Sequence, residues 1–108
     1  MTTYSLSPSQ FAKKILHLSQ HMRDMSHKQD WTACMELEEQ RQVVMNALFG
    51  HKDMPQALED IAEILEQVLF IDSESLYICE EARNKEMKNI KKSMTQRKAA
   101  LSYHSHFE

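Results

Sequence analysis

The chain has 108 residues, of which 42% are hydrophobic and 27% charged, with a formal net charge of −3. These values indicate one folded domain over residues 1–108 and exclude a disordered chain. One glycine and two prolines are too few turn residues for a sheet of many short strands. Long runs of Ala, Leu, Glu, Gln, Lys, Arg and Met favour helices instead, so we expect an all-α protein.

The N-terminus lacks the pattern of a signal peptide, and no apolar run reaches the roughly 18 residues of a membrane helix. We therefore expect a cytoplasmic protein that does not contact a membrane. Cys34 and Cys79 stand alone in the sequence, without the spacing of a disulfide framework or a zinc site. No metal ion and no cofactor are expected.

The first helix is predicted over about residues 8–27. Ser7 can cap it, Pro8 suits the first helical position, and Gln10 can complete a capping box. His17 and His21 are one turn apart but lack a third ligand nearby, so we do not expect them to bind a metal.

The second helix is predicted over about residues 31–49, with Asp30 as its cap. Gly50 follows directly, where a left-handed C-terminal cap prefers glycine. The turn to Pro55 is short, so we expect the second and third helices to be antiparallel neighbours.

Arg41 interrupts the apolar face of the second helix between Leu37 and Val44. Glu38 lies three residues earlier on the same face, within reach of the guanidinium. Asp72 lies beside an apolar stripe of the third helix. We expect Glu38, Arg41 and Asp72 to form a partly buried ion network that sets the register of the two helices, more than it adds stability.

The third helix is predicted over about residues 55–94 and is the longest. It carries one apolar stripe of leucines and one of isoleucines, with Val68 between them, over an arc of about 200° where roughly 100° usually covers one core. Periodicity leaves open which stripe faces inward. The surplus surface can be buried by neighbours or a second copy, or can receive a partner. The members of the two stripes are Leu58, Leu65, Leu69 and Leu76, and Ile64, Ile71 and Ile78.

The remaining segment, about residues 95–108, is predicted to be a short C-terminal helix or a tail. We expect the third helix either to break around residues 93–95 or to be covered by a second chain. Tyr103 is the expected anchor of a segment that folds back, because its ring is apolar and its tip polar.

Charge is distributed unevenly. Residues 30–81 contain thirteen acidic against two basic residues, a net charge of −11, whereas residues 83–98 contain seven basic residues against Glu86, a net charge of +6. The basic segment is either a solvated helical face or a docking surface for an acidic partner or for the acidic part of this protein. Direct binding of nucleic acid is not expected, since no aromatic residues are interleaved for base stacking.

The sequence from Asp30 onward resembles the FliT family of flagellar export chaperones, over roughly three-quarters of the chain. The resemblance rests on the order and spacing of several short motifs. These are Asp30-Trp31, Leu37-Glu38, Arg41-Gln42, Ile64-Leu65, Ile71-Asp72-Ser73-Glu74, Arg83 and Leu101-Ser102-Tyr103.

The resemblance implies a bundle of three main helices with a short fourth, and a cytoplasmic chaperone for type III export. Such proteins bind the C-terminal segment of the filament-cap protein FliD, prevent its premature assembly and escort it to the export apparatus. Contacts with the export ATPase complex and with the flagellar master activator are also implied. The client-facing residues would be Leu65, Val68, Leu69 and Leu76, with Tyr103 on a covering segment.

Two alternatives stay open. The protein could act as a regulator that sequesters the flagellar master transcription activator, or as a structural homodimeric helical adaptor. An enzyme is not expected, because the sequence has no glycine-rich phosphate loop and no credible pair of nucleophile and base.

Overall fold

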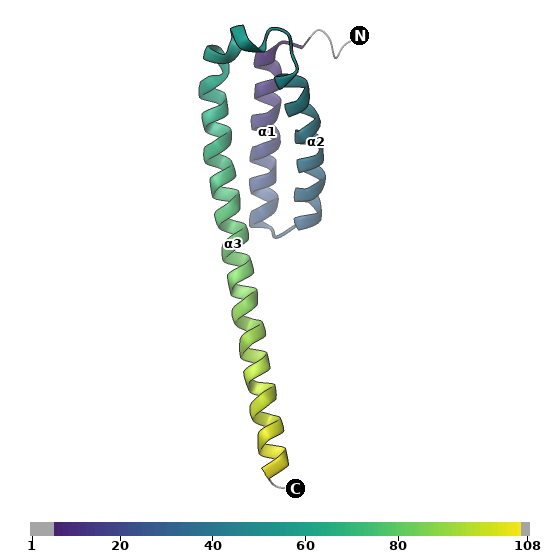
Figure 1. The fold of residues 1–108 in the computed structure, drawn as a ribbon, viewed down its shortest axis with the longest axis vertical. Helices are drawn as coiled ribbons and strands as arrows, with labels where there is room; N and C mark the ends of the chain where they lie inside the picture. Colours follow the sequence, from purple (N-terminus) through teal and green to yellow (C-terminus); the bar gives the residue numbers. More distant parts are fainter. Residues whose placement is uncertain (1–5, 107–108) are drawn as a thin grey trace. The chain divides into compact units, whose positions relative to one another are not determined.

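The computed structural model describes the backbone of residues 6–106 and the side chains of residues 6–101. Every regular element in that range is a helix: α1 spans Pro8–His27, α2 Trp31–Phe49 and α3 Met54–His106 (Figure 1). The expected all-helical fold with three main helices is confirmed. The chain divides into two units, Met1–Ile78 and Cys79–Glu108, and α3 contributes residues to both.

The start of α1 is fixed by its own side chains. Ser7 Oγ accepts a hydrogen bond from the backbone N–H of Gln10 at 3.2 Å, and Gln10 Oε1 accepts one from the N–H of Ser7 at 2.8 Å. Pro8 occupies the first turn, where its missing N–H costs nothing. These contacts satisfy donors that the helix cannot pair internally.

The two short connections differ from the sequence expectation in their backbone. Gly50 ends α2 with φ −90°, which any residue can adopt, so the prediction of a left-handed cap there is wrong. The left-handed position lies instead at Gln29, with φ 58°, in the connection between α1 and α2. Asp30 then caps α2, its Oδ1 accepting from the N–H of Ala33 at 3.1 Å.

His51 holds the connection between α2 and α3. Its Nδ1 accepts from the N–H of Asp53 at 3.0 Å, while its Nε2 lies 3.2 Å from the carbonyl oxygen of Leu6. Its ring meets that of Phe11 edge to face, with centroids 6.2 Å apart. The turn is thereby tied to the N-terminal end of α1.

The core of the first unit draws on all three helices, which lie side by side there (Figure 1). On α3 the buried positions Met54, Ile61 and Val68 are seven residues apart, so they form one line along the helix. The buried members of the core cluster are Phe11, Ala12, Ile15, Val44, Leu48, Met54, Ile61 and Val68.

α3 continues through residues 93–95, so the alternative of a break there is wrong, and the helix ends at His106 rather than near residue 94. The hydroxyl of Thr95 donates to the carbonyl oxygen of Lys91 at 2.9 Å, one turn earlier. A threonine satisfied in this way does not need to leave the helix. The neighbouring Lys, Met, Gln, Arg and Ala residues are good helix formers, so the segment 95–108 shows no separate helix of its own within the described residues.

Arg41 is a polar contact point between the three helices. Its Nη1 donates to Oδ1 of Asp72 on α3 at 2.6 Å, and its Nη2 donates to Oε2 of Glu38 on α2 at 2.6 Å. Nη1 also donates to Oγ of Ser19 on α1 at 2.9 Å. The structure therefore brings together Glu38, Arg41 and Asp72, and it adds a partner that sequence reasoning missed.

Ser19 is fully buried and donates its hydroxyl proton to the carbonyl oxygen of Ile15 at 2.8 Å. Its oxygen is therefore free to accept a hydrogen bond from Arg41, so the hydroxyl acts both as a donor and as an acceptor. The sequence carries one signal for this contact. Ser19 follows Ile15 by four residues, so it is a polar residue on the apolar face of α1.

Burial is the largest single influence on Arg41 and acts to lower its pKa, because it disfavours the charged form. The hydrogen bond and negative charge of Asp72, and then those of Glu38, together outweigh burial, so the pKa of Arg41 is raised above its ordinary value. The guanidinium stays charged, and it cannot relieve its burial by losing a proton. Its Nε has no hydrogen-bond partner, so the network is not fully satisfied.

We expect Arg41→Leu to lower the free energy of unfolding by about 1–2 kcal/mol, less than the loss on breaking a fully buried ion pair. The reason is that the Arg41 side chain is 11% exposed, but those of Glu38 and Asp72 are 45% and 38% exposed and can be rehydrated. Urea denaturation measures the loss. The matched control is Arg23→Leu, which removes the more open pair between Arg23 and Glu74 at 3.3 Å and should cost less than about 1 kcal/mol. Equal losses in the two variants would contradict a special role for Arg41.

We expect Ile61→Ala to lower the free energy of unfolding by about 2–5 kcal/mol, because it opens a cavity in the core. Ile61 has no exposed surface, whereas Leu58, one turn earlier, is 51% exposed. Leu58→Ala should therefore cost less than about 1 kcal/mol. Comparable losses in the two variants would show that α3 is rotated about its axis relative to this description.

Candidate functional site

A stripe of leucines on α3 runs along the edge of the core. We call Leu58, Leu65, Leu69 and Leu76 the leucine stripe. Leu69 is 67% exposed and Leu76 60% exposed, while Leu65 is half-buried and packs against the edge of the core. The spacings of seven, four and seven residues place all four side chains on one side of the helix.

The direction that periodicity left open is therefore set by the structure. Ile71 is buried and Ile64 packs against the core, so the isoleucine stripe lies on the inward side together with Ile61. The leucine stripe lies mostly on the outward side. The surplus apolar surface of α3 is an exposed row of leucines.

Val68 is 6% exposed and belongs to the core cluster, so it is not part of an open binding surface. The expectation that Val68 faces a client together with Leu65 and Leu69 is therefore corrected. The orientation of α3 about its axis turns Val68 toward the core. A side chain seven residues after Ile61 points to the same side as Ile61. Tyr103 lies within the helical backbone of α3, but its side chain is outside the described residues.

Acidic side chains accompany the leucine stripe. Glu59, Glu63 and Glu66 are all exposed on the same stretch of α3. Placed at roughly 100° per residue, Glu66 and Glu59 lie about 80° and 100° from the leucine stripe, toward the side opposite the core. A ligand that covers the leucines therefore meets a negatively charged border.

Phe70 and Tyr77 form a second exposed apolar pair, 67% and 64% exposed and seven residues apart. They lie on the side of α3 opposite the core, where a simple bundle gives them no partner. Phe70 also borders a shallow hollow of mixed polarity. The hollow is lined by Arg23, Glu63, Glu66, Gln67, Phe70 and Ile71.

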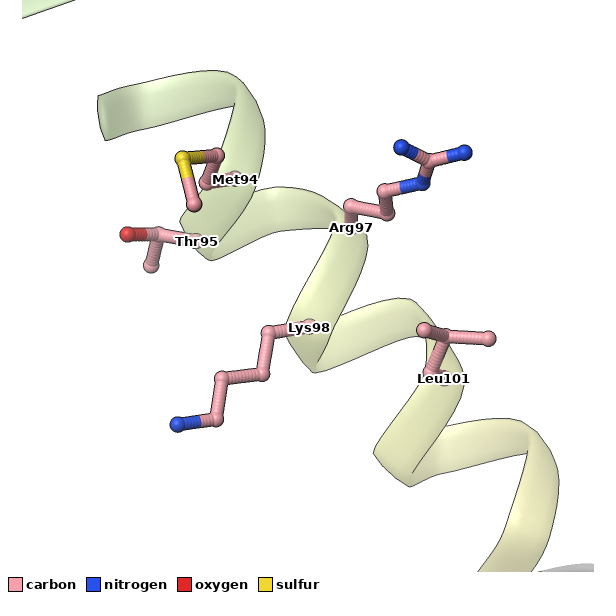
Figure 2. Close-up of a pocket in the computed structure, with 5 residues that line it drawn as sticks. All are labelled: Met94, Thr95, Arg97, Lys98 and Leu101. Carbon is pink, nitrogen blue, oxygen red and sulfur yellow. The ribbon is translucent and has the colours of Figure 1, made fainter. Parts of the chain in front are cut away.

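The basic segment, residues 83–98, is exposed at every position. Four large apolar side chains of the second unit are exposed as well, namely Met87, Ile90, Met94 and Leu101. Figure 2 shows Met94 and Leu101 projecting from one stretch of α3 together with Thr95, Arg97 and Lys98, and these five line a shallow hollow. Apolar and positively charged groups therefore share this surface.

Within residues 6–101, no three His, Cys, Asp or Glu side chains gather closely enough to hold a metal ion. His17 and His21 are both exposed on α1. Among the described helices, none combines the length and the apolar character needed to cross a membrane.

Comparison with known proteins identifies a family. The model of the family described as "Flagellar protein FliT" matches residues 11–105. No curated protein and no solved structure matches the chain. The match includes α1 from Phe11 onward, in which sequence reasoning found only a similar length and pattern. With almost the whole chain matched, the protein belongs to the FliT family of flagellar proteins.

Proposed function

We propose that this protein is a non-enzymatic cytoplasmic chaperone of flagellar type III export that binds the C-terminal segment of the filament-cap protein FliD. By covering that segment, it would prevent premature assembly and deliver FliD to the export apparatus. One observation carries the proposal. The leucine stripe leaves Leu58, Leu69 and Leu76 exposed on a helix whose adjoining side is buried in the core.

An amphipathic helix is the form of client that suits this surface. Such a helix docks through apolar anchors about one turn apart, and the leucines of α3 present anchors at the same spacing. Leu65, between Leu58 and Leu69, is half-buried and packs against the core, so the stripe is anchored at that point. The exposed Glu59 and Glu66 favour a client with basic residues beside its apolar face.

We propose that the leucine stripe is supported by helices of which α1 and α2 are antiparallel neighbours. Ser26, near the end of α1, lies 3.5 Å from Cys34 near the start of α2, and Ser19 lies opposite Arg41. The later residue of α1 contacts the earlier residue of α2, and the earlier residue of α1 contacts the later one. This order supports antiparallel packing of α1 and α2. Such a support holds the leucines in place before the client arrives, which lowers the entropy cost of binding.

Tyr103 keeps its proposed place on a covering segment, and contacts with the export ATPase complex and the master activator are further proposals from the family resemblance. Each contact is testable by a pull-down of this protein with the export ATPase or with the activator.

We expect the double variant Leu69→Asp, Leu76→Asp to bind a peptide of the FliD C-terminal segment at least roughly a hundredfold more weakly. Each exposed leucine that a client buries contributes about 1.5–3 kcal/mol, and an aspartate at that place leaves a charge against an apolar surface. Fluorescence anisotropy of a labelled peptide measures the affinity. Circular dichroism should show unchanged helix content, since both leucines are exposed.

The control for this prediction is Val43→Asp. Val43 is 69% exposed on α2 and lies outside the leucine stripe, so its substitution should leave peptide affinity unchanged. Undiminished binding by the double variant, or an equal loss in Val43→Asp, would exclude the leucine stripe as the client site.

A further inference from the structure

The second unit carries a narrow apolar face on α3. We call Met87, Ile90, Met94 and Leu101 the distal row. At roughly 100° per residue, these four side chains lie within an arc of about 60° around the helix. Their exposed fractions lie between 46% and 65%, and every side chain from residue 83 to residue 101 is exposed. Within the described part of the chain, the distal row therefore has no cover.

Basic side chains border the distal row on both sides. Lys91 and Lys98 lie about 70° and 50° from the centre of the row on one side, and Arg97 lies about 50° from it on the other. Arg83 lies in line with the row, one turn before its first member. Figure 2 shows Arg97 and Lys98 on the same stretch of α3 as the last two members of the row.

An apolar row with a basic border has the chemistry of a helix that lies on an anionic lipid surface. The apolar side chains enter the boundary between headgroups and acyl chains, and the long stems of lysine and arginine let their charged ends reach the phosphates. Residues 83–98 have a net charge of +6, whereas the whole chain has −3. Attraction to an anionic surface must therefore come from this segment and not from the total charge of the protein.

The arginines favour a lipid surface over another helix as the occupant. The spacing of the distal row is also that of a seam between paired helices, but Arg83 and Arg97 would then occupy two of its core positions. Burying two guanidinium groups in such a seam weakens the pairing. At a lipid surface the same groups can each bind a phosphate through two hydrogen bonds. A nucleic acid backbone also offers phosphates, but it leaves the apolar row in water.

We propose that residues 83–101 of α3 bind the surface of an anionic phospholipid bilayer, with the distal row turned toward the acyl chains. The expectation that the protein does not contact a membrane came from the lack of an apolar run long enough to span one. A helix that lies on the surface needs no such run. The proposal is independent of the proposed function, because the leucine stripe takes no part in it.

The test is co-sedimentation of the full chain with vesicles of phosphatidylcholine that contain roughly one-third phosphatidylglycerol. We expect the chain to bind these vesicles, to ignore vesicles of phosphatidylcholine alone, and to bind more weakly as salt is raised. The double variant Lys91→Glu, Lys98→Glu should bind at least roughly thirtyfold more weakly. Each lysine beside an anionic surface contributes about fivefold in affinity, and each glutamate adds repulsion.

The double variant Lys85→Glu, Lys92→Glu is the matched control. It makes the same change of net charge at the same spacing of seven residues, but both positions lie about 170° from the centre of the distal row. Its affinity should fall by less than roughly fivefold, because its charges are held a helix diameter away from the surface. Equal losses in the two double variants would overturn the distal row as the contact face.

The double variant Ile90→Ser, Met94→Ser removes apolar surface and keeps every charge. It should bind the anionic vesicles roughly tenfold more weakly or worse, since both side chains leave water in the bound state. An unchanged affinity would show that the row does not enter the bilayer. A chain that fails to sediment with anionic vesicles would overturn the proposal, and its capture of a polyglutamate peptide instead would assign the basic face to an acidic protein.

Discussion

The orientation of α3 about its own axis is the constraint that decides which of its side chains are buried and which are exposed. Met54, Ile61 and Val68 are buried against α1 and α2, and their spacing of seven residues allows only one side of α3 to face inward. Once that side is set, the leucine stripe must lie at the edge of the core and beyond it. Burial of a few apolar side chains thus determines which residues of α3 a partner can reach.

Arg41 supports this rotation by a different kind of force. Apolar packing is nondirectional and tolerates small slips of one helix along another, whereas hydrogen bonds at 2.6 Å to Glu38 and Asp72 do not. The contact with Ser19 extends the same restriction to α1. The network therefore specifies alignment, and the neighbouring core supplies most of the stability.

Much of this architecture can be predicted from the sequence because it depends on local chemistry. The capping box at Ser7, the cap at Asp30 and the charge of Arg41 on an apolar face are readable within a few residues. The inward direction of α3 was not readable, since Leu65 and Val68 are equally apolar and differ only in what faces them. The continuation of α3 past Thr95 was not readable either, since the hydroxyl of Thr95 can bond one turn back within a helix or compete with the helix, and the sequence does not say which.

The leucine stripe also has a geometric property that bears on the path of a client helix. Leu58 and Leu76 are 18 residues apart, which at 3.6 residues per turn is about five whole turns, so they lie on one line parallel to the axis. A client helix can follow that line without winding around α3.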